Sequence, residues 1–279
     1  MGSTEPLRLD RLAERHIGGC MALSAEAGWN QTADDWTLFL HRGTVYGLPD
    51  SGGHTVATGA VLPYPGGFAW VSMVLVTAPR RRERIGTRIL EICCADVVER
   101  GLVAMLDATP AGERVYRPLG FEPIFGLTRW QGEGGVRSNL PAGVRAMTRG
   151  DLPVVAAIDA AAFGAPRMFL IESLLCRAPQ FAFVTQDGFA LARPGRIATQ
   201  IGPVVAANEA SAATLLDAAL SSAAGPVFLD LVDGWDDLKR RLIARNFTVQ
   251  RPFLRMGLRR GAPFGDPVRS FVVAGPEFG

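Results

Sequence analysis

The most informative segment of the chain is residues 74–90, which read VLVTAPRRRERIGTRIL. It begins as a buried apolar strand, passes through a short arginine-rich turn and continues as a helix near Gly86. The first N–H groups of a helix have no partner within it and lie at the positive end of its dipole. The turn is therefore suited to an anion, above all a pyrophosphate, with Arg81 adding a fork of donors and Gly86 allowing close approach of the backbone. A solvated surface turn is the alternative interpretation.

A second informative stretch lies at residues 106–121 and reads LDATPAGERVYRPLGF. A strand ends near Asp107, residues 109–112 turn, and a helix follows that carries Tyr116, one of three tyrosines in the chain. Taken alone, Tyr116 would be an ordinary residue of an amphipathic helix. A functional role for Tyr116 depends on the sequence motif around it.

Apolar periodicity predicts alternating strands and helices in both halves of the chain. In the first half we expect strands at Arg8–Leu9, Thr44–Leu48, Thr55–Leu62, Ala69–Val76, Val103–Ala108 and Glu122–Trp130, and helices at Arg11–Ala27, from Thr32, at Gly86–Arg100 and at Ala111–Pro118. In the second half we expect helices at Leu152–Ala162, Ala210–Ser222 and Asp236–Ala244, and strands at Phe181–Thr185, Phe189–Ala192, Ala198–Val205, Val227–Leu231 and Thr248–Leu258. Antiparallel strands come first and β-α-β units later, which indicates an α/β (α+β) fold with a mixed sheet flanked by helices.

The two halves resemble each other. Arg129 follows Phe121 by eight residues, and Arg255 follows Phe247 by the same number, at the start of each final strand. A Pro-Gly turn also lies ten residues before the strand end at Val76 in the first half and ten residues before that at Val205 in the second. These agreements favour a duplication.

A domain boundary is expected near residues 131–145, which begin with a Gly-rich, polar segment. We therefore predict a first domain at residues 1–132 and a second at residues 143–279, each of ordinary domain size.

The two informative stretches together resemble the GNAT superfamily of acyl-CoA N-acyltransferases. The turn of that family reads Arg/Gln-x-x-Gly-x-Gly/Ala, and here it reads Arg81-x-x-Arg84-x-Gly86. The family pattern Tyr-x-x-Leu-Gly-Phe matches residues 116–121 fully. Arg84 departs from the family because it stands where glycine is usual. We expect Arg84 to lie in the first turn of the helix with its side chain pointing outward, where it is tolerated.

Further segments are similar to the tandem, YitH-like type of GNAT protein. These segments are residues 27–32, 192–195, 200–205 and 275–279. The resemblance implies two tandem GNAT folds, each with a mixed, mostly antiparallel twisted sheet. It also implies acetyl-CoA as co-substrate, bound in the first domain by residues of the strand, the turn and the later helix. They are Val74, Leu75, Val76, Arg81, Arg82, Arg84, Ile85, Gly86, Thr87, Thr109, Ala111, Gly112 and Tyr116.

The resemblance implies direct attack of an amine on the thioester. A tyrosine side chain, with a pKa of about 10, can protonate a departing thiolate whose acid has a pKa of about 8.5, so Tyr116 is the candidate general acid. Asp107 is a candidate base or anchor for the substrate ammonium, or alternatively the cap of the 109–112 turn.

Weaker candidates for the base are Glu26, Asp34 and Asp35. By the same resemblance Trp29, Asn30 and Gln31 line the acceptor pocket, while Asn30 or Thr32 could cap the next helix.

The second half lacks both signals. At the positions of the repeat that correspond to Arg81, Gly86 and Tyr116 it has Ala210, Leu215 and Leu242. Glu209 would also repel a phosphate. We therefore expect one coenzyme site, in the first domain, and a degenerate second domain that shapes the acceptor pocket or mediates pairing.

Composition narrows the other possibilities. The chain has 279 residues, a net charge of +2 and 48% hydrophobic residues, which indicates a globular protein without a basic footprint for nucleic acid. Neither an apolar run long enough for a membrane span nor the core of a signal peptide is found, and four scattered cysteines and three histidines fit no metal pattern.

We expect a cytoplasmic monomer or homodimer that acts on a small-molecule amine, without metal, membrane or nucleic-acid partners. A non-catalytic acyl-CoA sensor is the main alternative, and an RNA- or partner-binding module using residues 80–84 is a further one.

Overall fold

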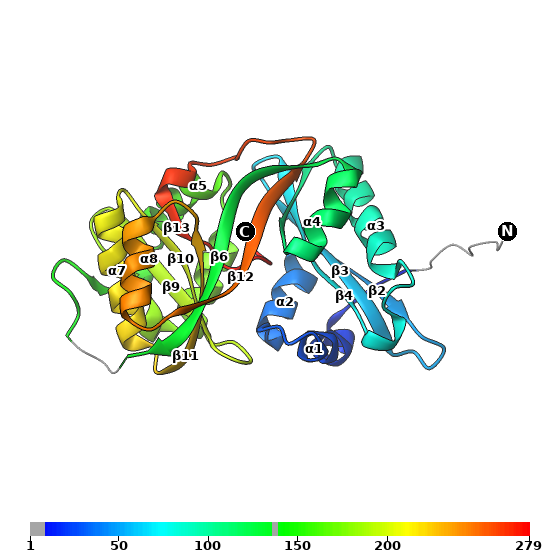
Figure 1. Ribbon diagram of the computed structural model, residues 1–279, viewed down its shortest axis with the longest axis horizontal. Coiled ribbons are helices and arrows are strands. Elements are labelled where there is room, and N and C mark those ends of the chain that lie inside the picture. The colour runs from blue at the N-terminus through cyan, green and yellow to red at the C-terminus, as the bar shows by residue number, and fades with distance from the viewer. Residues whose placement is uncertain (1–8, 136–138) are drawn as a thin grey trace. The chain divides into compact units, whose positions relative to one another are not determined.

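The computed structural model describes residues 9–135 and 139–279, and it divides into two compact units (Figure 1). The first unit comprises the described residues up to Pro63 together with Gly67–Ala104, and the second comprises Tyr64–Gly66 and Met105–Gly279. Arg8, where a strand was expected to begin, lies outside the described residues.

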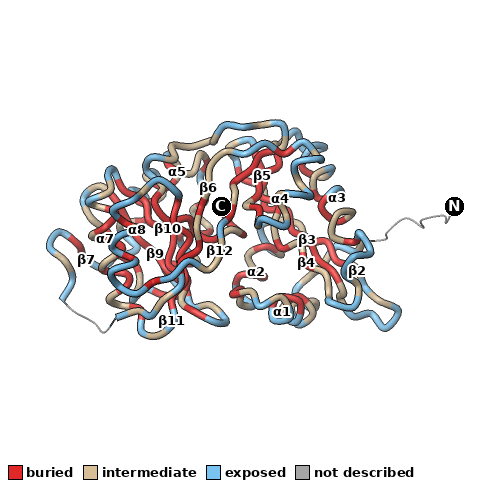
Figure 2. Tube along the Cα trace, in the orientation of Figure 1, coloured by how far each residue is buried: buried red, intermediate tan, exposed pale blue. Residues whose placement is uncertain are grey.

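The first unit is an antiparallel sheet with helices packed on it. Its elements are β1 (Asp10–Arg11), η1 (Glu14–His16), α1 (Ile17–Glu26), α2 (Ala33–Arg42), β2 (Thr44–Pro49), β3 (Thr55–Tyr64), β4 (Phe68–Val76), η2 (Ala78–Arg80) and α3 (Ile85–Glu99). The strands follow the order β1-β2-β3-β4. Helix α3 lies close to the sheet because Gly59 has no side chain, and a Cβ at Gly59 would lie 2.4 Å from Cγ2 of Ile89. Figure 2 shows the buried residues concentrated in these strands.

The second unit contains the rest of the chain. Its elements are β5 (Val103–Ala108), α4 (Pro110–Tyr116), η3 (Arg117–Leu119), β6 (Phe121–Gly134), β7 (Arg145–Ala146), η4 (Arg149–Asp151), α5 (Leu152–Phe163), α6 (Met168–Arg177), η5 (Pro179–Phe181), β8 (Phe183–Val184), β9 (Gly188–Arg193), β10 (Thr199–Ala206), α7 (Glu209–Ser222), β11 (Gly225–Val232), α8 (Asp236–Ala244), β12 (Thr248–Leu258), η6 (Pro267–Arg269) and β13 (Ser270–Val272). The strand order is β5-β12-β6-β11-β13-β10-β9-β8-β7, and α7 packs on β9 and β10 (Figure 1).

The long strands β6 and β12 are exchanged between the two halves of the sequence. Strand β12, from the second half, pairs antiparallel with β5 of the first half, and β6, from the first half, pairs antiparallel with β11 of the second. The two exchanged strands also pair with each other along most of their length. The repeat thus forms one continuous set of strands across the expected boundary.

Two buried ion pairs mark the exchange, one on each side. Arg255 of β12 lies directly opposite Asp107 of β5 and donates to both its carboxylate oxygens at 2.9 Å. Arg129 of β6 lies opposite Asp230 of β11 and donates to both its oxygens at 2.8 Å. The arginines occupy matching positions of the repeat, so each half contributes one aspartate and one arginine to the joint.

Most expected elements are confirmed, and the bounds of β5, α8 and β12 agree residue for residue. Helix α6 and the strands β7 and β13 were not expected, and the strand expected at Arg8–Leu9 was wrong at Leu9, because β1 lies at Asp10–Arg11. Helix α6 has Arg167 as its N-cap, and the Arg167 side chain makes no capping bond, so the start of this helix carries no sequence signal. The two short strands exist only through pairing with distant strands. The helix expected over residues 11–27 is shorter, because a 3-10 turn precedes α1.

Candidate functional site

The regular conformation of strand β4 is interrupted at Met73. This residue has a left-handed backbone with φ of 55°, and the Thr58 hydroxyl on β3 donates to its carbonyl at 2.9 Å. Up to Val71 the strand is buried on both faces, whereas beyond Met73 the residues Val74 and Val76 are only half-buried. At the end of β4 that was expected to bind the coenzyme, one face of the strand is therefore more exposed than the other.

The turn after β4 contains two further left-handed residues. Arg82 has φ of 69° and Arg84 has φ of 61°, and α3 starts immediately after Arg84. Arg84 is the N-cap residue, and its side chain makes no capping bond. The bonds of α3 begin with Arg88, whose N–H donates to the Arg84 carbonyl at 3.1 Å. The N–H groups of Ile85, Gly86 and Thr87, all expected at the site, thus lie at the end of the helix without partners inside it.

The expected place of Arg84 was wrong. We expected a residue within the first helical turn, where arginine is unstrained, but it precedes the helix in the left-handed region that glycine adopts most easily. The glycine usual at this position in the GNAT pattern would suit this backbone without strain. A helix-start pattern cannot show this, because it does not distinguish the N-cap from the residue after it.

Glu26, at the end of α1, holds the turn in place. Its carboxylate accepts from the Thr77 hydroxyl at 2.8 Å and from the N–H of Ala78, and it lies 4.0 Å from the Arg81 guanidinium. The Ala78 N–H, the Thr77 hydroxyl and the Arg81 charge lower the pKa of Glu26. These contacts show that Glu26 stabilises the conformation of the turn.

Arg81 itself is half exposed and bonds the strand it follows. Its Nε donates to the Val76 carbonyl at 3.0 Å, which holds the base of the side chain against the end of β4. The base of the guanidinium is thereby held at the end of β4, near the Glu26 carboxylate. The neighbouring Arg80 pairs instead with Glu83 at 2.8 Å.

Gly86 is the second residue of α3 and lies against the sheet. A Cβ at Gly86 would point toward the sheet, 3.6 Å from Cγ2 of Val76 and 4.0 Å from Cγ1 of Val74. These are ordinary van der Waals distances, so alanine would fit there and the packing of α3 on β4 does not require glycine.

The loop between α1 and α2 carries Trp29, Asn30 and Gln31. Asn30 and Gln31 are 4% and 5% exposed, and the Trp29 N–H donates to the Ser24 carbonyl at 2.8 Å. Within the described residues, Oε1 of Gln31 is buried without a hydrogen-bond partner. A buried acceptor without a donor is uncommon and calls for an explanation such as a ligand.

Thr32 is the N-cap residue of α2, which confirms the interpretation that Thr32 caps the helix after this loop. Its N–H donates to the Asp35 carboxylate at 2.9 Å, which forms the capping box of α2. Asp35 is fully buried in this cap, whereas Asp34 is exposed on the same turn.

In the second unit, the turn after β5 is capped by Thr109. Its hydroxyl accepts from the Gly112 N–H at 3.2 Å, so the alternative that Asp107 caps this turn is wrong. The Tyr116 ring lies over Gly112, where a Cβ would be 2.9 Å from Cε2 and 3.2 Å from the hydroxyl oxygen. Gly112 thus leaves the space that the ring occupies, and the Phe121 ring lies 5.9 Å from it. Ala111 lies beside Gly112 in α4.

Asp107 is completely enclosed. Both of its oxygens are bound by Arg255, and its side chain is 0% exposed. Burial raises the pKa of Asp107, and the Arg255 charge opposes that rise. Asp230 makes the same pair with Arg129 in the other half, which lacks the candidate tyrosine. The shared arrangement points to a role in joining the exchanged strands.

The second half shows how its corresponding site is closed. Strands β10 and β11 pair in parallel from Thr199 to Ile201 and then separate, and β13 lies between them. Gly202, with φ of 141°, precedes Val205 by three residues, as Met73 precedes Val76 in β4. The second half therefore keeps the backbone irregularity, but its own strand fills the gap.

The helix that follows β10 is also capped. The Asn208 side chain accepts from the Ser211 N–H at 3.0 Å, and Glu209 adds an acid to the first turn of α7. This helix start differs from that of α3, where Arg84 supplies no cap.

Among residues 9–135 and 139–279, no group of three or more His, Cys, Asp or Glu side chains could hold a metal ion. In the same ranges, each helix is too short or too polar to cross a bilayer.

Part of the chain matches a known protein family. Residues 155–265 match the family model described as an acetyltransferase (GNAT) domain. The uncharacterized N-acetyltransferase YitH of Bacillus subtilis (strain 168) is 22% identical over 247 residues, which is 86% of this chain and 87% of that protein. The family match lies in the second half, where the sequence predicts a degenerate GNAT domain.

Solved structures share the fold. A proposed acetyltransferase from Pyrococcus horikoshii aligns with a TM-score of 0.79 at 19% identity, covering 98% of this chain and 95% of that one. A tandem GNAT protein from the clavulanic acid biosynthesis pathway aligns with a TM-score of 0.60 at 15% identity, covering 90% and 97%. The chain thus has the fold of tandem GNAT proteins, and its residues 155–265 match a GNAT acetyltransferase domain.

Proposed function

We propose that the protein transfers an acetyl group from acetyl-CoA to a primary amine by direct attack. The observation that carries this proposal is the start of α3. Arg82 and Arg84 have left-handed backbones, the N–H groups of the first turn have no side-chain cap, and Arg81 is anchored to the Val76 carbonyl at the end of β4. Consecutive backbone N–H groups at a helix start form an anion site that suits a diphosphate.

The residues expected to hold the coenzyme have distinct roles in this proposal. The N–H groups of Ile85, Gly86 and Thr87 bind the diphosphate, and Arg81 adds a charged donor. Arg82 and Arg84 shape the turn through their backbones. The backbone of Val74, Leu75 and Val76, beyond the irregularity at Met73, bonds the pantetheine amides. Thr109, Ala111 and Gly112 form the support for Tyr116.

Acetyl-CoA supplies the acetyl thioester: the amine nitrogen bonds to the carbonyl carbon, the C–S bond breaks, and a thiolate leaves. We propose that Tyr116 donates its phenolic proton to that sulfur. The phenolate is then reprotonated with the proton that the new amide nitrogen releases. Gly112 supports this role, because it leaves room for the ring to lie across the first turn of α4.

The acceptor side rests on the loop of residues 29–31. A protonated amine offers N–H donors, and Oε1 of Gln31 is a buried acceptor that lacks one among the described residues. Asn30 is enclosed in the same loop, and Trp29 provides an aromatic surface for an amine. Asp107 positions β5 and β12 through Arg255 in this account, so the proton of the incoming ammonium leaves through water or another group.

The second half has a structural or acceptor-shaping role in this proposal, with one coenzyme site per chain. The capped start of α7 and the insertion of β13 between β10 and β11 support it. Free thiols at Cys20 and Cys93 are compatible with a reducing compartment, and we propose the cytoplasm. The acceptor class is a small-molecule amine.

The test is the variant Tyr116→Phe, which keeps the ring over Gly112 and removes only the proton. We expect kcat to fall by about 100-fold or more while the Kd for coenzyme A changes by less than about 2-fold. Thiol release with a panel of amine acceptors gives the rate, and calorimetry gives the Kd. Wild-type protein that binds coenzyme A but acetylates no acceptor would instead support the acyl-CoA sensor, and unchanged turnover in Tyr116→Phe would refute the role of the phenol.

A further inference from the structure

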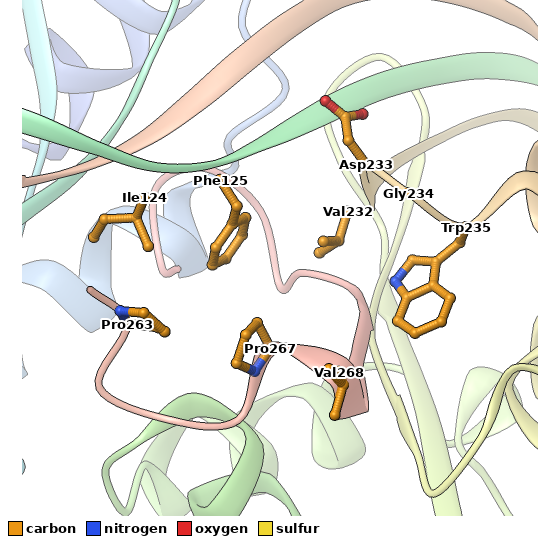
Figure 3. Close-up of a pocket in the computed structure, with 9 residues that line it drawn as sticks. All are labelled: Ile124, Phe125, Val232, Asp233, Gly234, Trp235, Pro263, Pro267 and Val268. Carbon is orange, nitrogen blue, oxygen red and sulfur yellow. The ribbon is translucent and has the colours of Figure 1, made fainter. Parts of the chain in front are cut away.

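The second unit contains a pocket of about 270 Å³ that is lined by residues with no part in the proposed acetyl transfer (Figure 3). It lies between three segments: β6, the turn after β11 and the loop that leads to β13. The lining residues are Ile124, Phe125, Val232, Asp233, Gly234, Trp235, Pro263, Pro267 and Val268. The volume is close to the lower end of small-ligand pockets, at about 300 Å³, and suits a ligand of one or two rings.

The lining is apolar and firmly supported. Trp235 packs on the buried ring of Phe271, with ring centroids 4.3 Å apart. Phe125 lies under the Arg255 guanidinium at 4.9 Å. Both aromatic residues pack against the buried cluster that includes Val232. The pocket therefore has walls that are held in place from behind.

The charged member of the lining faces elsewhere. The Asp233 carboxylate accepts from the Thr128 hydroxyl at 2.8 Å, and its N–H donates to the Gly126 carbonyl at 2.9 Å. Gly126 makes this possible, because a Cβ there would lie 2.2 Å from Oδ2 of Asp233. In Figure 3 the carboxylate points toward β6 and away from the pocket. A charged ligand would therefore find no counter-charge directed at it from the lining.

One polar group of the pocket lacks a partner. The indole Nε1 of Trp235 is buried and has no hydrogen-bond partner within the described residues. In Figure 3 this nitrogen lies on the side of the ring that faces the other lining residues. An indole nitrogen is a donor only, so the group that would complete it is an acceptor on a ligand. Leaving such a buried donor unpaired costs free energy, so a ligand acceptor that pairs with it favours binding.

We propose that this pocket binds a small, neutral aromatic or alicyclic molecule that carries one hydrogen-bond acceptor, such as a carbonyl oxygen. The ring packs between Phe125 and the prolines, and the acceptor takes the Trp235 N–H. The site is separate from the proposed acetyl transfer and does not depend on it.

The test uses two probes of matched shape, acetophenone with a carbonyl and ethylbenzene without one. Ligand-observed NMR titrations are made on the full chain and on the variant Trp235→Phe, which keeps a ring on Phe271 and removes the donor. We expect saturable binding of acetophenone that weakens about 5-fold in Trp235→Phe, while ethylbenzene binds both proteins alike.

A second variant places the binding in this pocket. Val268 is 60% exposed, so Val268→Trp fills the opening with little effect on the core, and Val249→Trp, at a valine 54% exposed outside the pocket, is its control. We expect Val268→Trp to abolish binding of both probes and Val249→Trp to leave it unchanged, with thermal unfolding confirming that both variants fold. Absence of saturable acetophenone binding to the wild type, binding that survives Val268→Trp, or equal weakening of both probes in Trp235→Phe would overturn the proposal.

Discussion

The left-handed backbone of Arg84 predicts how substitution by glycine changes the free energy of unfolding, and the structure gives the size of that change. With φ of 61° and ψ of 12°, the residue lies in a region that costs a side chain with a Cβ about 1–2 kcal/mol. Glycine removes that strain but adds about 0.5–1 kcal/mol of entropy to the unfolded chain. We therefore expect Arg84→Gly to raise the free energy of unfolding by about 0.5–1 kcal/mol and Tm by about 1–3 °C.

The control separates strain from charge. Arg84→Ala removes the same exposed guanidinium but keeps the Cβ, so it loses the charge and keeps the strain. Arg82→Gly, at φ of 69°, should stabilise in the same way as Arg84→Gly. Arg80→Gly, in the 3-10 turn with an ordinary backbone, should destabilise.

Urea unfolding followed by circular dichroism measures these differences, and a titration with coenzyme A measures the consequence for the site. We expect Arg84→Gly to bind coenzyme A at least as tightly as Arg84→Ala, because the turn keeps its shape. If Arg84→Gly were no more stable than Arg84→Ala, the turn would not have the left-handed conformation on which the proposed anion site depends.

Three further predictions concern buried groups. Asp107→Ala leaves Arg255 buried without its partner and should cost about 3–5 kcal/mol in urea unfolding, whereas a loss of turnover with unchanged stability would mark Asp107 as a catalytic base. Burial raises the pKa of Cys20 to about 12 and raises that of Cys93, so Ellman's reagent should label the exposed Cys176 first in the native protein, a fast phase that Cys176→Ser removes. Because the folded pKa values of Cys20 and Cys93 lie above the unfolded value of about 8.5, their contribution is complete below that pH, and stability should fall by up to about 1.4 kcal/mol per pH unit for each thiol above it; a flat pH profile in thermal unfolding would contradict this.

The sequence predicts the local features of this fold well. The turn after β4, the helix α3 and the capping box at Thr32 all follow from short patterns whose physics is local. The contrast between the halves is equally local, since Ala210 stands at the position that corresponds to Arg81.

Features that depend on distant pairing could not be predicted. The partner of Asp107 is 148 residues away, and the exchange of β6 and β12 leaves no mark in either strand alone. Strand β13 has three residues and forms only because β10 and β11 separate around it. The conformation of Arg84 was missed for another reason: left-handed backbone is readable from a glycine but not from an arginine.

A single diphosphate site at the start of α3 is central to the proposed acetyl transfer. A crystal structure of the wild-type protein with coenzyme A tests it directly. We predict one molecule per chain, with its diphosphate bonded to the N–H groups of Ile85, Gly86 and Thr87 and to the Arg81 guanidinium. A diphosphate bound at the start of α7, or a second molecule between β10 and β11 in place of β13, would contradict the account.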